Sequence, residues 1–304
     1  MTRMLFKGIQ ISDERLLRLA TYASTGVAGG LVGVKLIAWL MTDAMALLSS
    51  LVDSLLDVAA SMVNLLAVRH ALRPADPEHR FGHGKAEPLA GLGQSAFIVG
   101  SALFLGLAAV NRLFKPVAID HISWGIGVMV VSLGATLSLI AFQKYVIHRT
   151  RSVAISADSL HYVGDLLVNG SVIVALGMVG LTGWHFIDPL LALLIALYVL
   201  YTAGQIIVRS FNLLMDRELP EQDRQRIRDI VAAEAEVIDM HELRTRSAGQ
   251  RDFIQLHLEL ERTLPLWHAH AIADRVEERL REAFPGADII IHEDPSGLFE
   301  THRP

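Results

Sequence analysis

Long apolar runs separated by short polar connections dominate the first two thirds of the chain. Crossing a hydrocarbon core about 30 Å thick takes about 20 mainly apolar residues in a helix, and six runs reach that length. They cover residues 18–40, 44–68, 88–111, 121–143, 154–182 and 187–209. The pattern predicts an α-helical membrane protein with six transmembrane helices.

Beyond residue 215 the long apolar runs stop, and the spacing of apolar residues becomes that of a soluble domain. Spacings of three and four residues indicate helices there, and alternating or short apolar runs indicate strands. In chain order these are a helix at 221–235, a weaker strand at 237–245, a strand at 252–260, a helix at 268–284 and a strand at 288–292. We therefore expect a transmembrane domain in residues 1–215 and a small α+β domain in residues 216–304.

Lysine and arginine are unevenly distributed over the two sides of the predicted membrane. One side carries Arg3, Lys7, Arg15, Arg18, Arg69, Arg73, Arg80, Lys85, Lys144, Arg149 and Arg151, and the other carries Arg112 and Lys115. Basic loops face the cytoplasm, so both termini are expected there. No apolar run precedes Asp13, and we interpret the N-terminus as a cytoplasmic leader rather than a signal peptide.

The composition restricts both the class of protein and the ligands that a metal site could use. Hydrophobic residues make up 52% of the chain and charged residues 19%, below the roughly 25% of soluble domains. The formal net charge of -5 argues against a nucleic-acid binder. Because the chain contains no cysteine, it has no disulfide, and any metal site must use nitrogen and oxygen ligands.

Two of the apolar runs contain pairs of acidic and histidine residues four positions apart. The segment LVDSLLD carries Asp53 and Asp57, and SLHYVGD carries His161 and Asp165. On a helix this spacing places both members of a pair on one face. Two such helices can close a tetrahedral site with four ligands, which suits zinc and tolerates other first-row divalent ions.

The energy of burial favours a ligand role over a structural one. A charged residue at the bilayer centre costs at least ~2.5 kcal/mol, whereas a polar contact between membrane helices contributes about 0.6 kcal/mol. A bound divalent ion, or protons in its absence, would relieve the charge of three carboxylates. We therefore hypothesise that metal moves out as protons move in. In the first run, Lys35 is expected to reach a helix end or a water-filled pocket, and Gly26, Gly29, Gly30 and Gly33 suit close helix packing.

The motifs LVDSLLDVAAS and ADSLHYVGD, with PADPEHRFGHGKAE between the second and third runs, resemble the cation diffusion facilitator family, and within it the bacterial zinc and ferrous-iron efflux type. The resemblance extends over nearly the whole chain. It implies a homodimeric metal/proton antiporter of the inner membrane that transports zinc, with iron or cadmium as further substrates. It also implies that Asp53, Asp57, His161 and Asp165 form the transport site, with Asp53 associated with broad metal choice.

The resemblance implies two further zinc sites. One lies in the loop after the second run and would use Asp76, His79 and His83; taken alone, this segment is equally well read as a solvated polar loop after Pro74 ends the helix. The other is a two-metal site in a cytoplasmic domain similar to a metallochaperone (ferredoxin-like). Its ligands would be His241, His257, His270, His292 and Asp294.

Parts of this cytoplasmic site have support from spacing. His257 lies on the polar side of its strand, and His292 and Asp294 share one face. The sequence does not indicate that His241 and His270 approach them. No role is assigned to the remaining histidines, which are His70, His121, His148, His185, His268 and His302.

Two other functions remain as alternatives. An intramembrane metalloprotease would be expected to show a motif such as HExxH, and none occurs; we therefore expect no enzyme. A membrane-bound sensor that binds metal without transporting it would explain the cytoplasmic histidines, but it has no need of ligands at mid-membrane. The expected partners are metal ions, protons, the lipid bilayer and a second copy of the chain.

Overall fold

The computed structural model describes residues 12–42, 45–114, 125–182, 184, 186–249 and 251–297. The chain divides into two compact units, Met1–Phe211 and Asn212–Pro304. Several positions used in the predictions lie outside the described residues: Arg3, Lys7, Lys115, His121, His185 and His302, and the starts of the second and fourth apolar runs.

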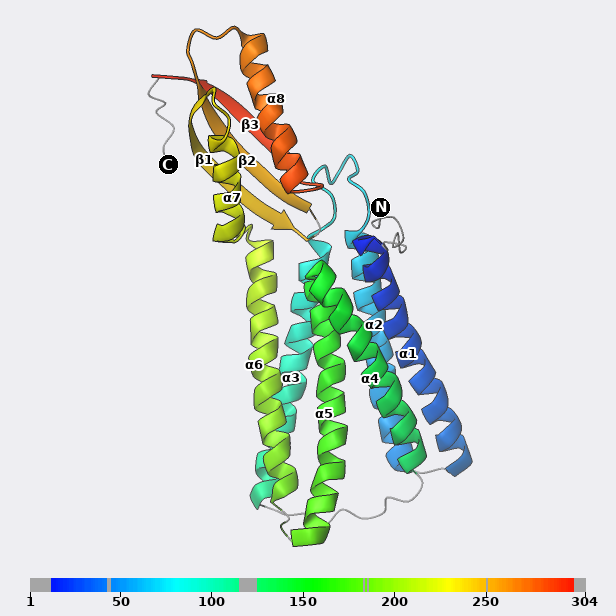
Figure 1. Cartoon of the computed structure of the whole chain (residues 1–304). Coiled ribbons are helices and arrows are strands. Elements are labelled where there is room, and N and C mark those ends of the chain that lie inside the picture. Colours follow the sequence, from blue (N-terminus) through cyan, green and yellow to red (C-terminus); the bar gives the residue numbers. More distant parts are fainter. Residues whose placement is uncertain are drawn as a thin grey trace, which may run out of the picture. The chain divides into compact units, whose positions relative to one another are not determined.

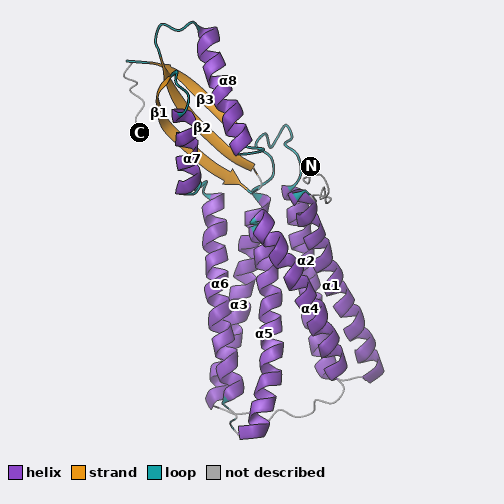
Figure 2. Ribbon diagram, viewed as in Figure 1, coloured by secondary structure: helices purple, strands orange, loops and turns teal. Residues whose placement is uncertain are grey.

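Six long helices form the first unit and run alongside one another (Figures 1 and 2). They are α1 (Asp13–Thr42), α2 (Met45–Ala71), α3 (Ala86–Phe114), α4 (Gly125–Thr150), α5 (Val153–Thr182) and α6 (Ile187–Leu214). Each has 26 to 30 residues. At 1.5 Å per residue this is longer than a bilayer core about 30 Å thick. The predicted helical membrane domain is confirmed.

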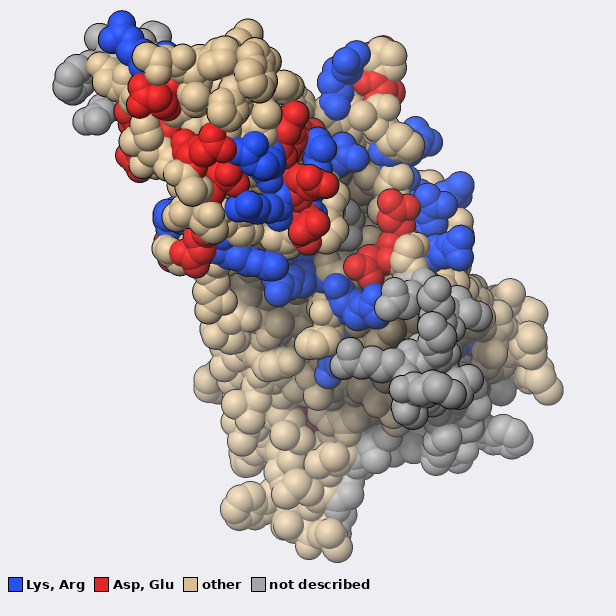
Figure 3. All heavy atoms as spheres, turned by 45° about the horizontal axis from the view of Figure 1, so that its top comes forward, with Lys and Arg blue, Asp and Glu red and all other residues tan. Residues whose placement is uncertain are grey.

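The lateral surfaces of these helices are apolar. By length and composition of the described residues, four segments qualify as membrane spans: Asp13–Met41, Leu51–Ala71, Ala86–Phe114 and Ile187–Leu214. Large apolar side chains of the six helices, such as Phe104 of α3 and Leu181 of α5, are exposed, at 76% and 89%. In Figure 3 red and blue spheres crowd the C-terminal unit, whereas the visible helical flanks are mostly tan. Such surfaces are suited to lipid rather than to water.

Helix α5 packs against α1, α2 and α4 in one cluster of side chains and against α3 and α6 in another. Towards its start, Ala154 and Ile155 join a buried cluster with residues of α1, α2 and α4. Ala157 and Leu160 of the same helix join a second cluster with residues of α3 and α6. Because His161 and Asp165 follow directly on α5, the helix that carries two predicted ligands is held on both sides.

The four glycines of α1 do not mark close contacts within the described part of the chain. A side chain added at Gly26, Gly29, Gly30 or Gly33 would meet no described atom within 4 Å. The close approach occurs instead at Gly91 of α3, where an added Cβ would lie 3.1 Å from Ser210 Oγ and 3.3 Å from the Val153 carbonyl. Small residues permit such contacts in membranes, but their spacing alone does not say which of them are used.

The second unit has the predicted order of elements. These are α7 (Glu221–Ala232), β1 (Val237–Ala248), β2 (Arg251–Leu260), α8 (Leu266–Ala283) and β3 (Asp288–Pro295). The sheet order is β1-β2-β3, with β1 antiparallel and β3 parallel to β2. The small α+β domain is thereby confirmed, although α7 ends three residues before its predicted limit.

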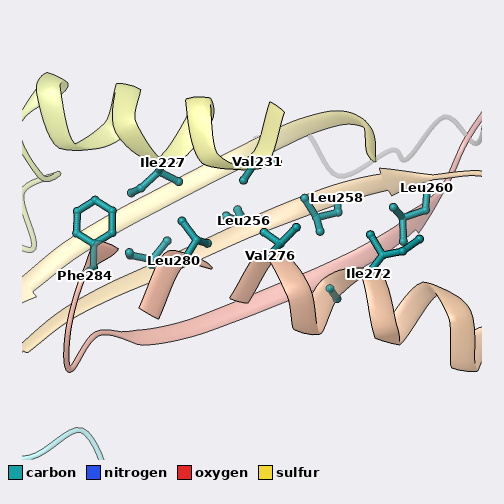
Figure 4. Close-up of a cluster of buried hydrophobic side chains, with 11 residues drawn as sticks. Ile227, Val231, Leu256, Leu258, Leu260, Ile272, Val276, Leu280 and Phe284 are labelled. Atoms are coloured by element: carbon teal, nitrogen blue, oxygen red, sulfur yellow. The ribbon is translucent and has the colours of Figure 1, made fainter. Parts of the chain in front are cut away.

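One face of this sheet is covered by both helices. Leu256 and Leu258 of β2 are 1% and 0% exposed and meet Ile227 of α7 and Val276 of α8 in a single core. Figure 4 shows these side chains pointing towards one another from the three elements. Since side chains alternate along a strand, His257 must project from the opposite face, which the two helices leave open.

Candidate metal centres

Three of the four predicted intramembrane ligands lie together between α2 and α5. His161 Nε2 lies 2.9 Å from Asp57 Oδ1 and 3.7 Å from Asp165 Oδ2. One ligand atom from each residue lies within 4.8 Å of the other two. All three residues are half-buried. A single cation between these atoms would therefore touch donors from two helices that are separated by about a hundred residues in sequence.

The fourth predicted ligand, Asp53, lies on α2 one turn before Asp57 and is exposed. It is not among the ligand atoms that converge. On the residue after it, Ser54 Oγ accepts a hydrogen bond from Lys35 Nζ of α1 at 2.7 Å. Lys35 thus faces α2 beside the acidic cluster, rather than extending to a helix end.

A buried carboxylate that the sequence reasoning missed holds α5 in place. Asp158 is fully buried and accepts hydrogen bonds from Gln94 Nε2 of α3 at 3.2 Å and Gln143 Nε2 of α4 at 2.7 Å. It lies three residues before His161. Its signal was an acidic residue inside an apolar run, but its partners are amides that no spacing rule connects with it. Asp158 fixes the helix that presents the predicted metal ligands.

The loop between α2 and α3 gathers its three predicted ligands. Asp76 Oδ1 lies 3.2 Å from His79 Nδ1, and Asp76 Oδ2 lies 3.2 Å from His83 Nε2. The backbone N–H of His79 also donates to the Asp76 carboxylate at 2.6 Å. This hydrogen bond holds the pKa of Asp76 below its usual range, with the two imidazoles adding to the effect. The carboxylate is therefore kept ionised and able to bind a cation.

On the open face of the small sheet, three histidines form one row. His241 pairs with His257 across β1 and β2, and His257 pairs with His292 across β2 and β3. Asp294, only 6% exposed, lies among them. Its oxygens are 3.2 Å from His241 Nε2, 2.8 Å from His257 Nδ1 and 3.1 Å from His292 Nε2. Strand register thus explains why residues far apart in sequence meet.

His270 does not reach this row in the described structure. It lies near the start of α8, where its Nδ1 is 3.7 Å from Glu293 Oε1 and its Nε2 is 3.7 Å from Asp274 Oδ2. Glu293 alternates with Asp294 along β3, so the two carboxylates project to different sides. Of the five ligands expected from the resemblance, the row and Asp294 account for four.

Glu242 is a second residue that sequence reasoning missed. It follows His241 at an irregularity in the β1–β2 pairing and has a positive φ of 48°. Such an irregularity redirects side chains, and Glu242 Oε2 comes within 3.9 Å of His257 Nε2. A cavity of about 260 Å³ beside this carboxylate is also lined by His257 and His292. In the sequence, Glu242 was marked only by its position next to His241.

All three clusters combine imidazole nitrogen with carboxylate oxygen. Zinc binds such donors in tetrahedral geometry, and iron(II) accepts them as well. The donors differ in setting: one cluster lies in the helical unit, one in a loop at a helix end and one on a sheet. Their chemistry fits divalent cations in all three places.

Comparison with known proteins gives matches over both units. Residues 21–215 match the cation efflux transmembrane domain, and residues 219–296 match the cytoplasmic domain of cation efflux proteins. The cation-efflux pump FieF of Salmonella choleraesuis (strain SC-B67) is 48% identical over 284 residues, covering 93% of this chain and 94% of the relative. The FieF of Salmonella newport (strain SL254) matches with the same identity and coverage. A solved structure of CzrB, a candidate zinc transporter, in its zinc form has 34% identity and a TM-score of 0.27, covering 28% of this chain and 98% of that chain.

Proposed function

The chain belongs to the cation diffusion facilitator family of cation efflux proteins, and from that premise we propose that it exports zinc from the cytoplasm in exchange for protons. Its family is one of cation transporters and not a class of enzymes. The observation that carries the proposal is the convergence of Asp57, His161 and Asp165 from two membrane helices. Ligands placed there can serve an ion in transit, whereas a sensor could place them at the surface.

The donor set supports zinc as the first substrate. One imidazole and two or three carboxylates provide a site of nitrogen and oxygen ligands, which zinc occupies without geometric strain. Iron(II) and cadmium are proposed as further substrates, because carboxylates are less selective than thiolates. Asp53 would join the set on binding by turning towards Asp57 from the neighbouring turn of α2.

Proton exchange follows from the charge of the same site. Three carboxylates near one another in an apolar helical unit repel one another unless a cation or protons neutralise them. Metal binding requires deprotonated ligands, so metal and protons compete for the same atoms. Release of metal on the far side would then leave the carboxylates to take up protons there.

The remaining parts are assigned to regulation and assembly. We propose that the transport domain spans residues 1–215 and that residues 216–304 form a cytoplasmic domain that binds metal and pairs with a second copy. The loop cluster and the histidine row would sense cytoplasmic metal. Both termini would face the cytoplasm of a cell whose inner membrane holds the protein. The helices that carry the transport ligands, α2 and α5, would move against α3 and α6 to alternate access.

Flux measurements in proteoliposomes test this proposal. Wild-type protein with a pH-sensitive dye inside the vesicles should move zinc and protons in opposite directions. Asp57→Ala should abolish zinc flux, because the central ligand is lost. The matched control is His257→Ala, which removes a cytoplasmic ligand and should retain flux with altered dependence on zinc concentration. Zinc binding without flux in the wild type would refute transport, and zinc flux without proton movement would refute exchange alone.

A further inference from the structure

His70, which was assigned no role, lies in the last turn of α2 next to the loop cluster. Its ring centroid is 4.6 Å from that of His83, with the two rings nearly perpendicular. The ring centroid of His79 also lies 4.6 Å from that of His83. Three imidazoles therefore lie in a chain of ring contacts, and the Asp76 carboxylate contacts two of them, those of His79 and His83.

The ring spacing agrees with shared coordination of one ion. Zinc binds imidazole nitrogen at about 2.0–2.1 Å, and for two rings in tetrahedral positions this places their centroids about 5 Å apart. The pairs in the histidine row obey the same rule, at 5.3 Å for His241 with His257 and 4.6 Å for His257 with His292. The ring of His70 is therefore close enough to that of His83 to share an ion, although its nitrogens are not among the ligand atoms that already lie within 4.8 Å of one another.

The side chains of Asp76, His79 and His83 already lie close enough together to accept a fourth ligand. One ligand atom each from Asp76, His79 and His83 already lies within 4.8 Å of the others. His83 is only 8% exposed, and its Nδ1 is buried without a hydrogen-bond partner in the described structure. His70 is exposed, so its side chain can rotate about its two torsions towards Asp76 at small cost.

We propose that His70 is the fourth ligand of the loop site. The inference rests on the proposed function in that it takes the loop cluster to be a metal site. Three ligands leave a position open to water, whereas four protein ligands close a tetrahedral zinc site, as structural sites do. A cytoplasmic ion bound there would join the end of α2 to the segment before α3, where His83 O accepts the N–H of Ala86.

The experiment isolates the loop site in the full-length protein. In a background of His161→Ala and His257→Ala, which weakens the other two clusters, cobalt(II) serves as the probe because its visible absorption is stronger in tetrahedral sites than in octahedral ones. His70→Ala and His70→Gln are compared with His148→Ala, an exposed histidine near the end of α4. Asp76→Ala defines the signal left when the loop site is removed.

The expected result is a loss of at least ~10-fold in affinity for both His70 variants, since even the loss of a group that orients a ligand costs 10–100-fold. The tetrahedral absorption should weaken, and X-ray absorption of bound zinc should show one imidazole fewer. His148→Ala should leave all three readouts unchanged. If His70→Gln behaves like the background protein, or if affinity falls without loss of an imidazole, His70 is not a ligand.

This test separates the inference from the proposed function. Flux of the wild-type protein does not enter it. If binding is unchanged in the His70 variants but Asp76→Ala removes the cobalt signal, only the proposal that His70 is the fourth ligand is overturned. If Asp76→Ala also leaves binding unchanged, the loop holds no metal, and both the inference and the proposed sensing role of the loop fall.

Discussion

Lys35 places its ammonium group beside the intramembrane carboxylates. Its Nζ donates to Ser54 Oγ at 2.7 Å, and it lies close enough to Asp165 to interact with it electrostatically. A lysine in this position opposes a bound cation and so favours its release. The residue would therefore weaken metal binding and shorten the time that metal remains at the site.

Replacing Lys35 with methionine should make metal bind more tightly and leave more slowly. At an effective dielectric constant near 20 and a separation of about 10 Å, two unit charges interact by about 2 kcal/mol, so affinity should rise at least ~10-fold. Zinc titration and flux should show a lower half-saturation concentration together with a lower maximal rate. Lys35→Arg keeps the charge and is the control; equal affinity in Lys35→Met and wild type would contradict this account.

Residue spacing selected the candidate intramembrane ligands because both pairs lie one turn apart on long helices. Asp57, His161 and Asp165 converge as that spacing required. Spacing could not predict which of two carboxylates on α2 would face α5, since this depends on the rotation of the helix. His270 illustrates the same limit in the small unit: its element was predicted, but its distance from Asp294 depends on how α8 packs over the sheet.

At the scale of elements, the start of α5 is fixed by a group from another helix. Glu87 of α3 is 3% exposed, and its Oε1 accepts the N–H of Val153 at 3.1 Å. Ser152 caps the same end, accepting the N–H of Ile155 at 3.1 Å. Unpaired N–H groups at a buried helix end are unfavourable, so Glu87 ties the ligand-bearing helix to α3.

Glu87→Ala should lower the stability of the helical unit by about 1–2 kcal/mol, the range for loss of a helix cap. Glu87→Gln retains an oxygen acceptor at the same place and should lose less. Thermal unfolding in detergent, followed by size-exclusion chromatography, measures the difference. A melting temperature of Glu87→Ala equal to that of the wild type would show that the cap contributes nothing.

Gly91 offers a second test of packing between elements. An added methyl group would lie 3.1 Å from Ser210 Oγ and 3.3 Å from the Val153 carbonyl, so Gly91→Ala should destabilise the unit by about 1–3 kcal/mol through overpacking. Gly93 lies two residues further on α3, and nothing lies within 4 Å of its added Cβ. Gly93→Ala should be neutral or stabilising, because alanine favours helix by about 1 kcal/mol. The same unfolding assay applies, and similar losses in both variants would exclude the contact as the cause.

The elements themselves were largely predictable, whereas their contacts were not. Long apolar runs located all six membrane helices, and alternation located β2, because burial in lipid or on a sheet imposes these patterns on the sequence. The glycines of α1 and Gly91 of α3 look alike in the sequence, yet among the described residues it is Gly91 whose added Cβ would meet another helix. Which small residue is used depends on segments far along the chain, such as Ser210.

At the scale of the whole molecule, composition separates the two units. The apolar flanks of the helical unit need lipid, and the polar surface of the C-terminal unit needs water. The change falls where the contacts also divide the chain, between Phe211 and Asn212. Each unit carries its own histidine and carboxylate cluster, so removing one cluster should leave the fold of the other unit intact.

Orientation across the membrane is a prediction that this chain makes easy to test. It contains no cysteine, so a single introduced thiol is the only site for a maleimide. Thr182 ends α5 and Glu278 lies on α8, and both are exposed. With cytoplasmic termini, a membrane-impermeant maleimide should label Thr182→Cys in intact spheroplasts and Glu278→Cys only after lysis, and the unsubstituted chain should stay unlabelled. If only Glu278→Cys is labelled before lysis, the topology is the opposite of the predicted one, and so is the direction in which metal is moved.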